Sequence, residues 1–183
     1  MLRTGIAVSI LMTASVLADI SNCACDPSKP ETLEARECSL CREAENQPPD
    51  VKIFFLKDIN PRKPNRWLAL PRDHGHGGHH LHDMADKDRI ALWKAAIAKA
   101  KELWGDEDWG VAYNGEAVRT QCHAHLHIGK LLKHVCWPGR YIVISRPEQI
   151  PPHPAKGLWV HAAPGGKLHV HLEEGISETA LMR

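Results

Sequence analysis

Three histidines alternate with apolar residues in one short segment of the chain. His123, His125 and His127 are separated by Ala124 and Leu126. Because side chains on a strand point alternately to its two faces, a strand here would place the three imidazoles on one face. Imidazole titrates near neutral pH and serves as a nucleophile, a general acid or base, or a metal ligand. The spacing alone leaves two interpretations open, a reactive site or a solvated, metal-binding strand face.

The elements that must position these histidines follow from the apolar pattern. Apolar residues recur every three or four positions over about 86–104, which predicts one main amphipathic helix, and Gly105 suits its C-terminal end. Strands are predicted at 51–56, at 66–70, from 109 to a turn at Asn114-Gly115, and at 122–128, 141–145, 158–161 and 168–172. This order predicts an α+β domain with a mainly antiparallel sheet.

The N-terminal residues are typical of an exported protein. A basic start, a short apolar run and small residues in cleavage format predict a signal peptide over 1–18, with an uncleaved anchor as the alternative. A cysteine-containing lead-in over 19–50 and one domain over 51–183 are expected to follow. The mature protein is therefore expected to be periplasmic or secreted, with no permanent membrane span.

The overall charge points away from nucleic acid. Lys and Arg number 23 and Asp and Glu number 22, which gives a formal net charge of +1. Binding to nucleic acid is not expected, because the chain has no strong positive field. Recognition of a phosphate group must therefore be local.

Several motifs resemble the histidine-triad superfamily. The alternating histidine segment matches its signature, and the segments 55–61 and 67–74 resemble its two-strand hairpin, with an Asp-Ile-x-Pro turn and a Pro-basic-x-His end. The resemblance covers roughly residues 38–128, with the pieces in the family's order. Tyr113-Asn114 and the segment 119–123 look closest to the CDP-diacylglycerol pyrophosphatase branch, which comprises exported phosphohydrolases. Many relatives pair as homodimers.

The resemblance implies a role for several residues. His125 would attack the α-phosphorus to form a nucleotidyl-histidine intermediate, and His127 would contact the phosphate and assist the leaving group. The expected substrate is a nucleotide or a nucleotide-lipid. The residues that match substrate-binding positions are Asp58, Asn114, Thr120 and Gln121. Turn chemistry or simple strand polarity remains the alternative for all four of them.

Two features depart from the common family pattern. Arg66 stands where many members have a second histidine near the start of the second strand, and it could supply a fixed positive charge to a diphosphate. The histidine-rich stretch 74–82 replaces the usual approach to the helix. It suggests an additional loop that is sensitive to metals or gates the substrate.

The six cysteines allow either a metal site or disulfides. The two-residue gap between Cys38 and Cys41 lets both sulfurs reach one tetrahedral ion. The resemblance implies that His74 and His123 complete a structural zinc site, while export makes a disulfide the competing interpretation. Cys23 with Cys25, and Cys122 with Cys136, are further candidate disulfides. His169 and His171 are expected to lie on a solvated edge strand without a role.

Two functions follow from these patterns. The first is an enzyme, a phosphohydrolase or nucleotidyltransferase that acts on a nucleoside diphosphate compound. The second is a periplasmic zinc- or copper-binding protein that uses the same scaffold, suggested by 13 histidines and 6 cysteines.

Overall fold

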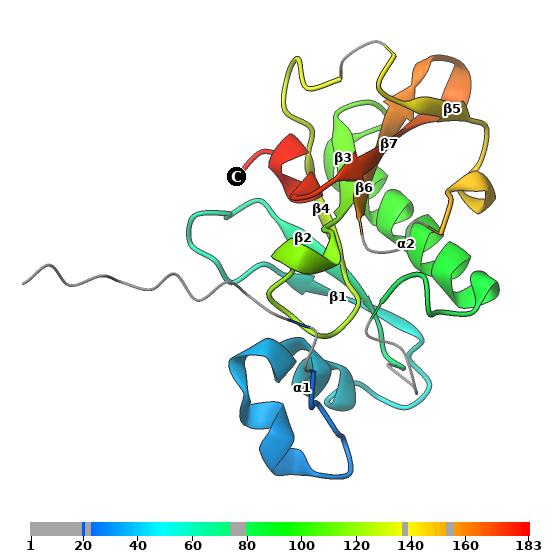
Figure 1. Cartoon of the computed structure of the whole chain (residues 1–183). Helices are drawn as coiled ribbons and strands as arrows, with labels where there is room; N and C mark the ends of the chain where they lie inside the picture. Colours follow the sequence, from blue (N-terminus) through cyan, green and yellow to red (C-terminus); the bar gives the residue numbers. More distant parts are fainter. Residues whose placement is uncertain (1–19, 21–22, 74–79, 137–138, 153–155) are drawn as a thin grey trace, which may run out of the picture.

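One seven-stranded sheet with a long helix on one face organises the chain. The computed structural model describes residues 20, 23–73, 80–136, 139–152 and 156–183 (Figure 1). All strand pairs are antiparallel, in the order β1-β2-β4-β3-β6-β7-β5. The prediction of an α+β fold with a mainly antiparallel sheet is therefore confirmed. The predicted signal peptide over 1–18 and the histidines at 74–79 lie outside the described residues.

The strands are β1 (Ile53–Lys57), β2 (Trp67–Pro71), β3 (Trp109–Tyr113), β4 (Leu126–Lys130), β5 (Ile142–Ile144), β6 (Gly157–Ala163) and β7 (Lys167–Glu174). The helices are α1 (Ser39–Glu45) and α2 (Asp86–Trp104). Short 3-10 turns are η1 (Pro30–Glu34), η2 (Arg36–Cys38), η3 (Glu116–Val118), η4 (Pro147–Gln149), η5 (Pro164–Gly166) and η6 (Ser177–Ala180). None of the helices in the described part of the chain has the length and apolar character that crossing a bilayer requires.

Helix α2 forms where the apolar period predicts it. Its buried face includes Leu92, Trp93, Ala96 and Ile97, which join the alternate inward side chains of β3, β4, β6 and β7 in the main core. Asp86 and Asp88 stand in its first turn, where carboxylates favour the positive end of the helix dipole. Gly105 ends the helix with a φ of 76°, a value that glycine adopts without strain.

The connection between β3 and β4 differs from the predicted tight turn. Instead of a hairpin at Asn114-Gly115, the chain forms η3 and an extended stretch before β4 starts at Leu126. The predicted strand over 122–128 is thus shorter than expected. His123 and His125 precede the strand, so the alternation of a regular strand does not govern them.

The lead-in packs across one end of the sheet. On α1, Leu40 and Ala44 are buried against Phe54 of β1 and against Leu68 and Leu70 of β2. The lead-in lies at the lower end of the view, beside the β1–β2 hairpin (Figure 1). This packing leaves α1 next to the segment that carries the histidines.

Two disulfides hold the lead-in, and neither matches a predicted pair. Cys23 is bonded to Cys122, and Cys25 is bonded to Cys38. The predicted pairs Cys23–Cys25 and Cys122–Cys136 are wrong, because the fold brings partners together that are 99 and 13 residues apart in the sequence. Cys41 and Cys136 keep free thiols.

The long-range disulfide should contribute more to stability than the local one. A cross-link that closes a loop of about 100 residues restricts the unfolded chain by about 4.7 kcal/mol, against about 3 kcal/mol for about 15 residues. We expect Cys23→Ala/Cys122→Ala to lower the free energy of unfolding more than Cys25→Ala/Cys38→Ala, as measured by urea unfolding without reductant. An equal or inverted order would show that the covalent tie to Cys122 is not the dominant restraint.

Candidate active site

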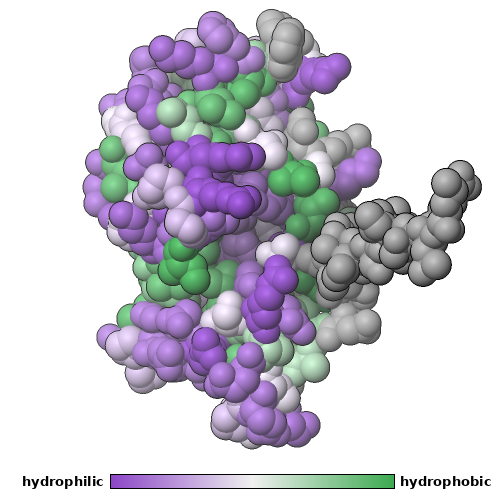
Figure 2. All heavy atoms as spheres, turned by 90° about the vertical axis from the view of Figure 1, so that its left-hand side faces the viewer, coloured by the Kyte–Doolittle hydropathy of each residue, from purple (hydrophilic) through white to green (hydrophobic). Residues whose placement is uncertain are grey.

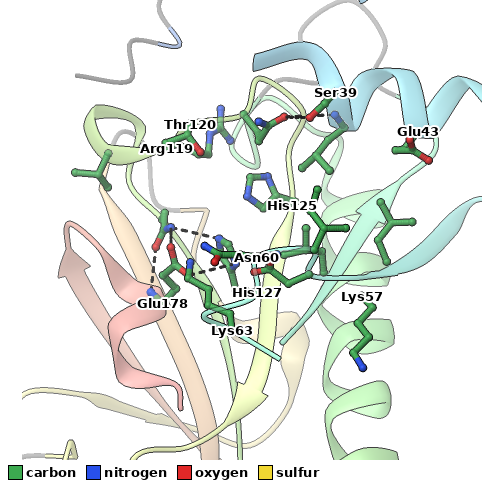
Figure 3. Close-up of a pocket in the computed structure, with 18 of the residues that line it drawn as sticks. Ser39, Glu43, Lys57, Asn60, Lys63, Arg119, Thr120, His125, His127 and Glu178 are labelled. Carbon is green, nitrogen blue, oxygen red and sulfur yellow. Dashed lines mark hydrogen bonds and ion pairs between the residues drawn. The ribbon is translucent and has the colours of Figure 1, made fainter. Parts of the chain in front are cut away.

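A cleft of about 470 Å³ opens beside two of the three histidines (Figure 3). His125 and His127 both line it, and their ring centroids lie 4.9 Å apart in an edge-to-face arrangement. His123 does not line the cleft; it is fully buried, and its Nε2 donates to the Pro71 carbonyl at 2.7 Å. The prediction that all three imidazoles share one face therefore fails for His123. Two of the rings lie at the cleft, and the third is hydrogen-bonded to the end of β2.

The tautomer of His125 follows from its partner. Its Nδ1 lies 2.7 Å from the carbonyl oxygen of His123. A carbonyl only accepts hydrogen bonds, so Nδ1 carries the proton and donates it. Nε2 of the neutral ring is then left with its lone pair, which is the form that a nucleophilic imidazole needs.

His127 is held from two sides. Its Nε2 lies 3.3 Å from Nδ2 of Asn114, and its Nδ1 lies 3.6 Å from Oε2 of Glu178. An amide NH₂ only donates, so Nε2 accepts and the proton resides on Nδ1, on the side of the carboxylate. The pair orients the His127 ring beside His125.

Burial keeps both rings neutral. Burial lowers the pKa of His125 to about 3, with a contribution from the neighbouring His127, because two adjacent imidazolium ions would repel each other. Burial also lowers the pKa of His127 to about 4, although the Glu178 carboxylate acts in the opposite direction. Without a bound anion, His127 is thus not the imidazolium that the resemblance implies at neutral pH.

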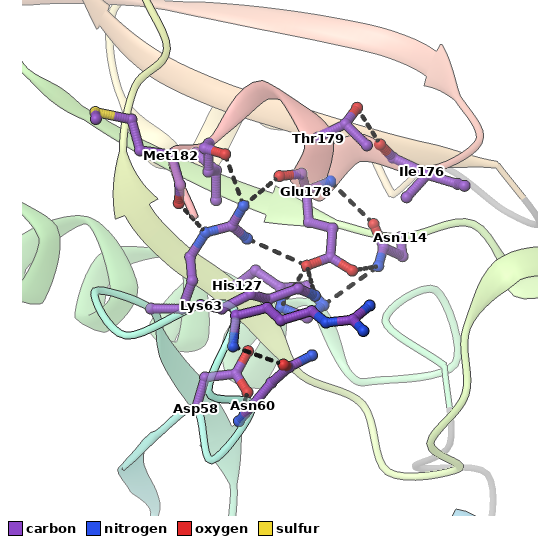
Figure 4. A network of polar contacts seen from close by, with 12 residues as sticks. Asp58, Asn60, Lys63, Asn114, His127, Ile176, Glu178, Thr179 and Met182 are labelled. Atoms are coloured by element: carbon purple, nitrogen blue, oxygen red, sulfur yellow. Dashed lines mark hydrogen bonds and ion pairs between the residues drawn. The ribbon is translucent and has the colours of Figure 1, made fainter.

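Glu178 is the central residue of a polar network that sequence patterns did not reveal (Figure 4). Its carboxylate accepts from Lys63 Nζ at 2.5 Å, Arg66 at 3.2 Å and Asn114 at 3.2 Å. Burial alone would raise the pKa of Glu178, but the neighbouring His127 side chain, the hydrogen bond and charge of Lys63 and the charge of Arg66 lower it to about 2. Glu178 lies on η6 near the C-terminus, 51 residues after His127 by number, and no motif around it marks a site.

Arg66 does not point a free charge at the cleft. Its guanidinium is buried and donates to three backbone carbonyls of the C-terminal segment as well as to Glu178. Gly129 makes room for this arrangement, because a Cβ there would lie 2.9 Å from Arg66 Cδ. The predicted role of Arg66 as a diphosphate ligand is wrong, since its donors hold the chain end that carries Glu178.

Of the four predicted substrate-binding residues, all line the cleft, but three have structural partners. Asp58 Oδ1 accepts from the backbone N–H of Asn60 at 2.9 Å, as the predicted turn cap would. Asn114 bonds to His127 and Glu178, and its Oδ1 accepts from Glu178 N–H at 3.0 Å. Thr120 is exposed at the cleft.

Gln121 fixes the lead-in rather than an open phosphate position. Its Oε1 accepts from Ser39 Oγ at 2.8 Å and from the backbone N–H of Leu40 at 3.4 Å, while its Nε2 donates to the Arg36 carbonyl at 3.0 Å. The Gln121 side chain thus provides hydrogen-bond partners at the start of α1, where the N-cap residue Cys38 makes no side-chain capping bond. Helix α1 is thereby held as one side of the cleft (Figure 3).

The rest of the lining is mixed in character. The apolar residues of the cleft are Leu40, Leu56, Ile59, Leu68 and Val118. The charged part of the lining contains both signs: the basic residues are Arg42, Lys57, Lys63 and Arg119, and the acidic residues are Glu43, Asp58 and Glu178. The surface on the side toward the left of Figure 1 is mostly hydrophilic, with scattered apolar patches (Figure 2). An anion in the cleft would therefore depend on individually placed donors and not on a strong general field.

Arg119 lines the cleft, and two of its guanidinium nitrogens have partners in the protein. Its NH1 donates to Tyr113 Oη at 2.7 Å, and its NH2 lies 3.1 Å from His80 Nδ1. The guanidinium also stacks over the Tyr113 ring at 5.4 Å. Arg119 thus fixes the start of the histidine segment against β3.

The predicted zinc site does not assemble from its predicted ligands. Cys38 is bonded to Cys25, and a disulfide sulfur carries no thiolate for a metal. Cys41 is free, but burial raises the pKa of its thiol to about 11, and His74 lies outside the described residues. Among the residues that the structure describes, two other groups of side chains could hold a metal by their spacing, Cys25, Cys38 and Cys122, and Cys136, His161 and His169. Only the second group is free of disulfides.

No protein-family model matches this chain. The likeness to the histidine-triad superfamily thus remains a prediction from the motifs.

The two neutral rings make stability depend on pH. The pKa of each is lowered in the folded state from the ordinary histidine value of about 6.5, so the unfolded state binds more protons below that value. The free energy of unfolding should therefore fall as the pH drops from about 6.5 toward about 4, by up to about 1.4 kcal/mol per pH unit for each ring. Urea unfolding over this range measures the slope.

A double variant supplies the control for this slope. His125→Asn/His127→Asn removes both titrating rings and should show a shallower decline than the unchanged chain over the same interval. Equal slopes for the two proteins would mean that the rings are not kept neutral by burial.

Proposed function

We propose that the protein is an exported phosphohydrolase or nucleotidyltransferase of the histidine-triad type, in which His125 attacks a nucleoside diphosphate-linked substrate. The observation that carries this proposal is the bond from His125 Nδ1 to the His123 carbonyl at 2.7 Å, which leaves the Nε2 lone pair at a cleft. The low pKa of His125 supports it, because the nucleophilic form is then fully populated at neutral pH.

In the proposed reaction, a bond forms between His125 Nε2 and the α-phosphorus while the bond from phosphorus to the bridging oxygen breaks. The leaving group departs with that electron pair. Water or an alcohol then attacks the phosphorus and gives its proton to His127, which is neutral after protonating the leaving group. The N–P bond breaks, and His125 regains its lone pair as the nucleotide leaves. Two displacements of this kind replace one harder step.

His127 and Asn114 are placed to assist the departing oxygen. His127 is neutral before the substrate arrives, but the negative charge of a bound phosphate raises the pKa of a nearby imidazole. The imidazolium can then donate its proton to the leaving oxygen. The Nδ2 amide of Asn114 contacts the His127 ring, and the ammonium of Lys63 contacts the Glu178 carboxylate next to that ring. Both groups can stabilise the charge that develops on the leaving oxygen.

The cleft suits a substrate with an apolar or planar part. Leu40, Leu56 and Leu68 line one part of it, and Asp58 retains a second carboxylate oxygen for hydroxyl groups. A nucleoside, with or without a lipid, presents both kinds of surface. Two disulfides support the expectation that the protein works in an oxidising compartment, the periplasm or outside the cell.

A metal-binding function ranks second. Structural zinc at Cys38, Cys41, His74 and His123 is not part of the proposal, because Cys38 is disulfide-bonded. The cysteine and histidine group at Cys136 favours a metal interaction at a separate place.

Replacing the nucleophile should abolish turnover without loss of the fold. His125→Asn keeps a side-chain N–H for the His123 carbonyl and removes the lone pair of Nε2, so we expect the rate to fall about a thousandfold or more. Hydrolysis of CDP-diacylglycerol and of dinucleoside polyphosphates measures turnover. Acid-sensitive nucleotidyl-histidine adducts, detected by mass spectrometry after a brief reaction, should form on the unchanged chain and be absent from the variant.

A matched histidine outside the cleft supplies the control. His134 is exposed and has a φ of 64°, which asparagine tolerates, so His134→Asn should retain full turnover. Turnover of the His125→Asn variant at the level of the unchanged chain would exclude this nucleophile. Absence of both turnover and adduct across the panel for the unchanged chain would favour the metal-binding function.

The pH profile should reveal the low pKa of the nucleophile. Since kcat/KM reports groups of the free enzyme, we expect no loss of kcat/KM as the pH falls from about 7 to about 5, because His125 stays neutral there, and a decline only toward about 3 to 4. An ordinary histidine would halve the rate near pH 6.5. Samples returned to neutral pH must recover full activity, which separates protonation from unfolding. A decline centred near 6.5 would contradict the assigned form of His125.

A further inference from the structure

A second cluster of histidines lies on the face of the sheet that α2 does not cover. Along β6 and β7, the residues Leu158, Val160, Leu168 and Val170 join the main core under α2. The alternate positions carry Trp159, His161, His169 and His171, which therefore project to the other face. The sequence-based expectation of a solvated edge strand is wrong here, because β7 pairs with both β6 and β5, and His161 and His171 are buried.

Cys136 reaches this cluster from the segment that follows β4. Its Sγ lies 3.6 Å from Nδ1 of His169. One ligand atom each of Cys136, His161 and His169 lies within 4.8 Å of the other two. A sulfur and a nitrogen bound to the same tetrahedral zinc ion are about 3.5 Å apart, as follows from bond lengths of about 2.3 and 2.0 Å. The Cys136–His169 pair already has this separation, and the ligand atom of His161 lies within 4.8 Å of both.

Neighbouring aromatic rings hold the cluster in place. Tyr141 stacks on His169 with ring centroids 3.8 Å apart, and Trp159 stacks on His171 at 3.6 Å. His171 Nε2 in turn lies 3.3 Å from His161 Nε2. A second layer of residues that fixes ligand rings is a common property of metal sites.

Simple packing explains the cluster less well than metal binding does. Both His161 and His171 are buried on this face of the sheet. Buried imidazoles need partners, and an apolar side chain would fill the same space at lower cost. One thiol and two imidazoles with converging ligand atoms are the donors that zinc and copper favour.

We propose that Cys136, His161 and His169 form a binding site for a borderline-soft transition-metal ion, with zinc as the expected occupant. Three protein ligands leave one position of a tetrahedral ion open to water or an exogenous ligand. Cys136 releases its proton on binding, since the thiolate is the ligand. His171 acts as a positioning residue through the ring of His161. None of the three ligands lines the cleft of His125, so this proposal does not depend on the proposed catalytic function.

Cobalt(II) provides a spectroscopic test. It replaces zinc in tetrahedral sites and gives a thiolate-to-metal charge-transfer absorption in the near ultraviolet only when a cysteine sulfur binds it. The oxidised, metal-free full chain should take up one cobalt ion with this absorption, and zinc should displace it. Copper(II), titrated in a parallel arm, establishes whether it competes more strongly than zinc, as the ordinary order of affinities would allow.

Variants identify the ligands. Cys136→Ser should remove the charge-transfer band, and His161→Gln or His169→Gln should weaken cobalt binding about tenfold or more. His134→Asn, close in sequence but outside the cluster, should leave the titration unchanged, and far-ultraviolet circular dichroism verifies that each variant is folded. Because histidines alone give no thiolate band, the histidine-rich stretch 74–82 cannot imitate this signal.

Cys41, the other free thiol, separates this proposal from the site predicted by sequence. Cys41→Ser should keep the band if Cys136 is the ligand. Loss of the band in Cys41→Ser, or its retention in a folded Cys136→Ser, would assign the metal to the lead-in and overturn the proposal. A chain that shows no band at any cobalt concentration would also overturn it, whatever its turnover of nucleotides.

Discussion

The site depends on one short hydrogen bond, from Nδ1 of His125 to the carbonyl oxygen of His123. That bond determines which nitrogen of His125 keeps its lone pair, because the carbonyl can only accept. The carbonyl is itself fixed, since the side chain of His123 donates to Pro71 at the end of β2. The first histidine thus orients the second from outside the cleft. In the proposed reaction, a ring held in this way would lose little freedom when it reacts, which is how positioning contributes to a rate.

The C-terminal segment contributes the buried carboxylate around which the charged groups of the site gather. Glu178 collects Lys63, Arg66, Asn114 and His127 around one carboxylate, and the positive groups overcome the cost of its burial. Arg66 reaches the same place with a guanidinium that also satisfies three backbone carbonyls. Buried charges are tolerated only when paired and hydrogen-bonded, and this network meets both conditions. The tail of the chain is therefore held where it can set the tautomer and the pKa of His127.

The lead-in is connected to the histidine segment by bonds that differ from those expected. A zinc ion at Cys38 and Cys41 was predicted to connect it to the sheet. In the structure a disulfide from Cys23 to Cys122 and the amide of Gln121 make this connection, directly before His123. The predicted zinc ion and the observed bonds would each place α1 beside the cleft. The thiol and imidazole groups with the spacing of a metal site occur elsewhere, on the open face of β6 and β7.

The sequence predicts the sheet-forming segments and the span of α2, because apolar periodicity and side-chain alternation are local properties. It could not place His123, since the chain leaves strand geometry before Leu126. It also gave no sign of Glu178 or of the disulfide partners, and it interpreted His169 and His171 as solvated. Those features arise where residues distant in the sequence meet, and only the tertiary structure decides which of them do, because burial and charge are set by neighbours from other elements.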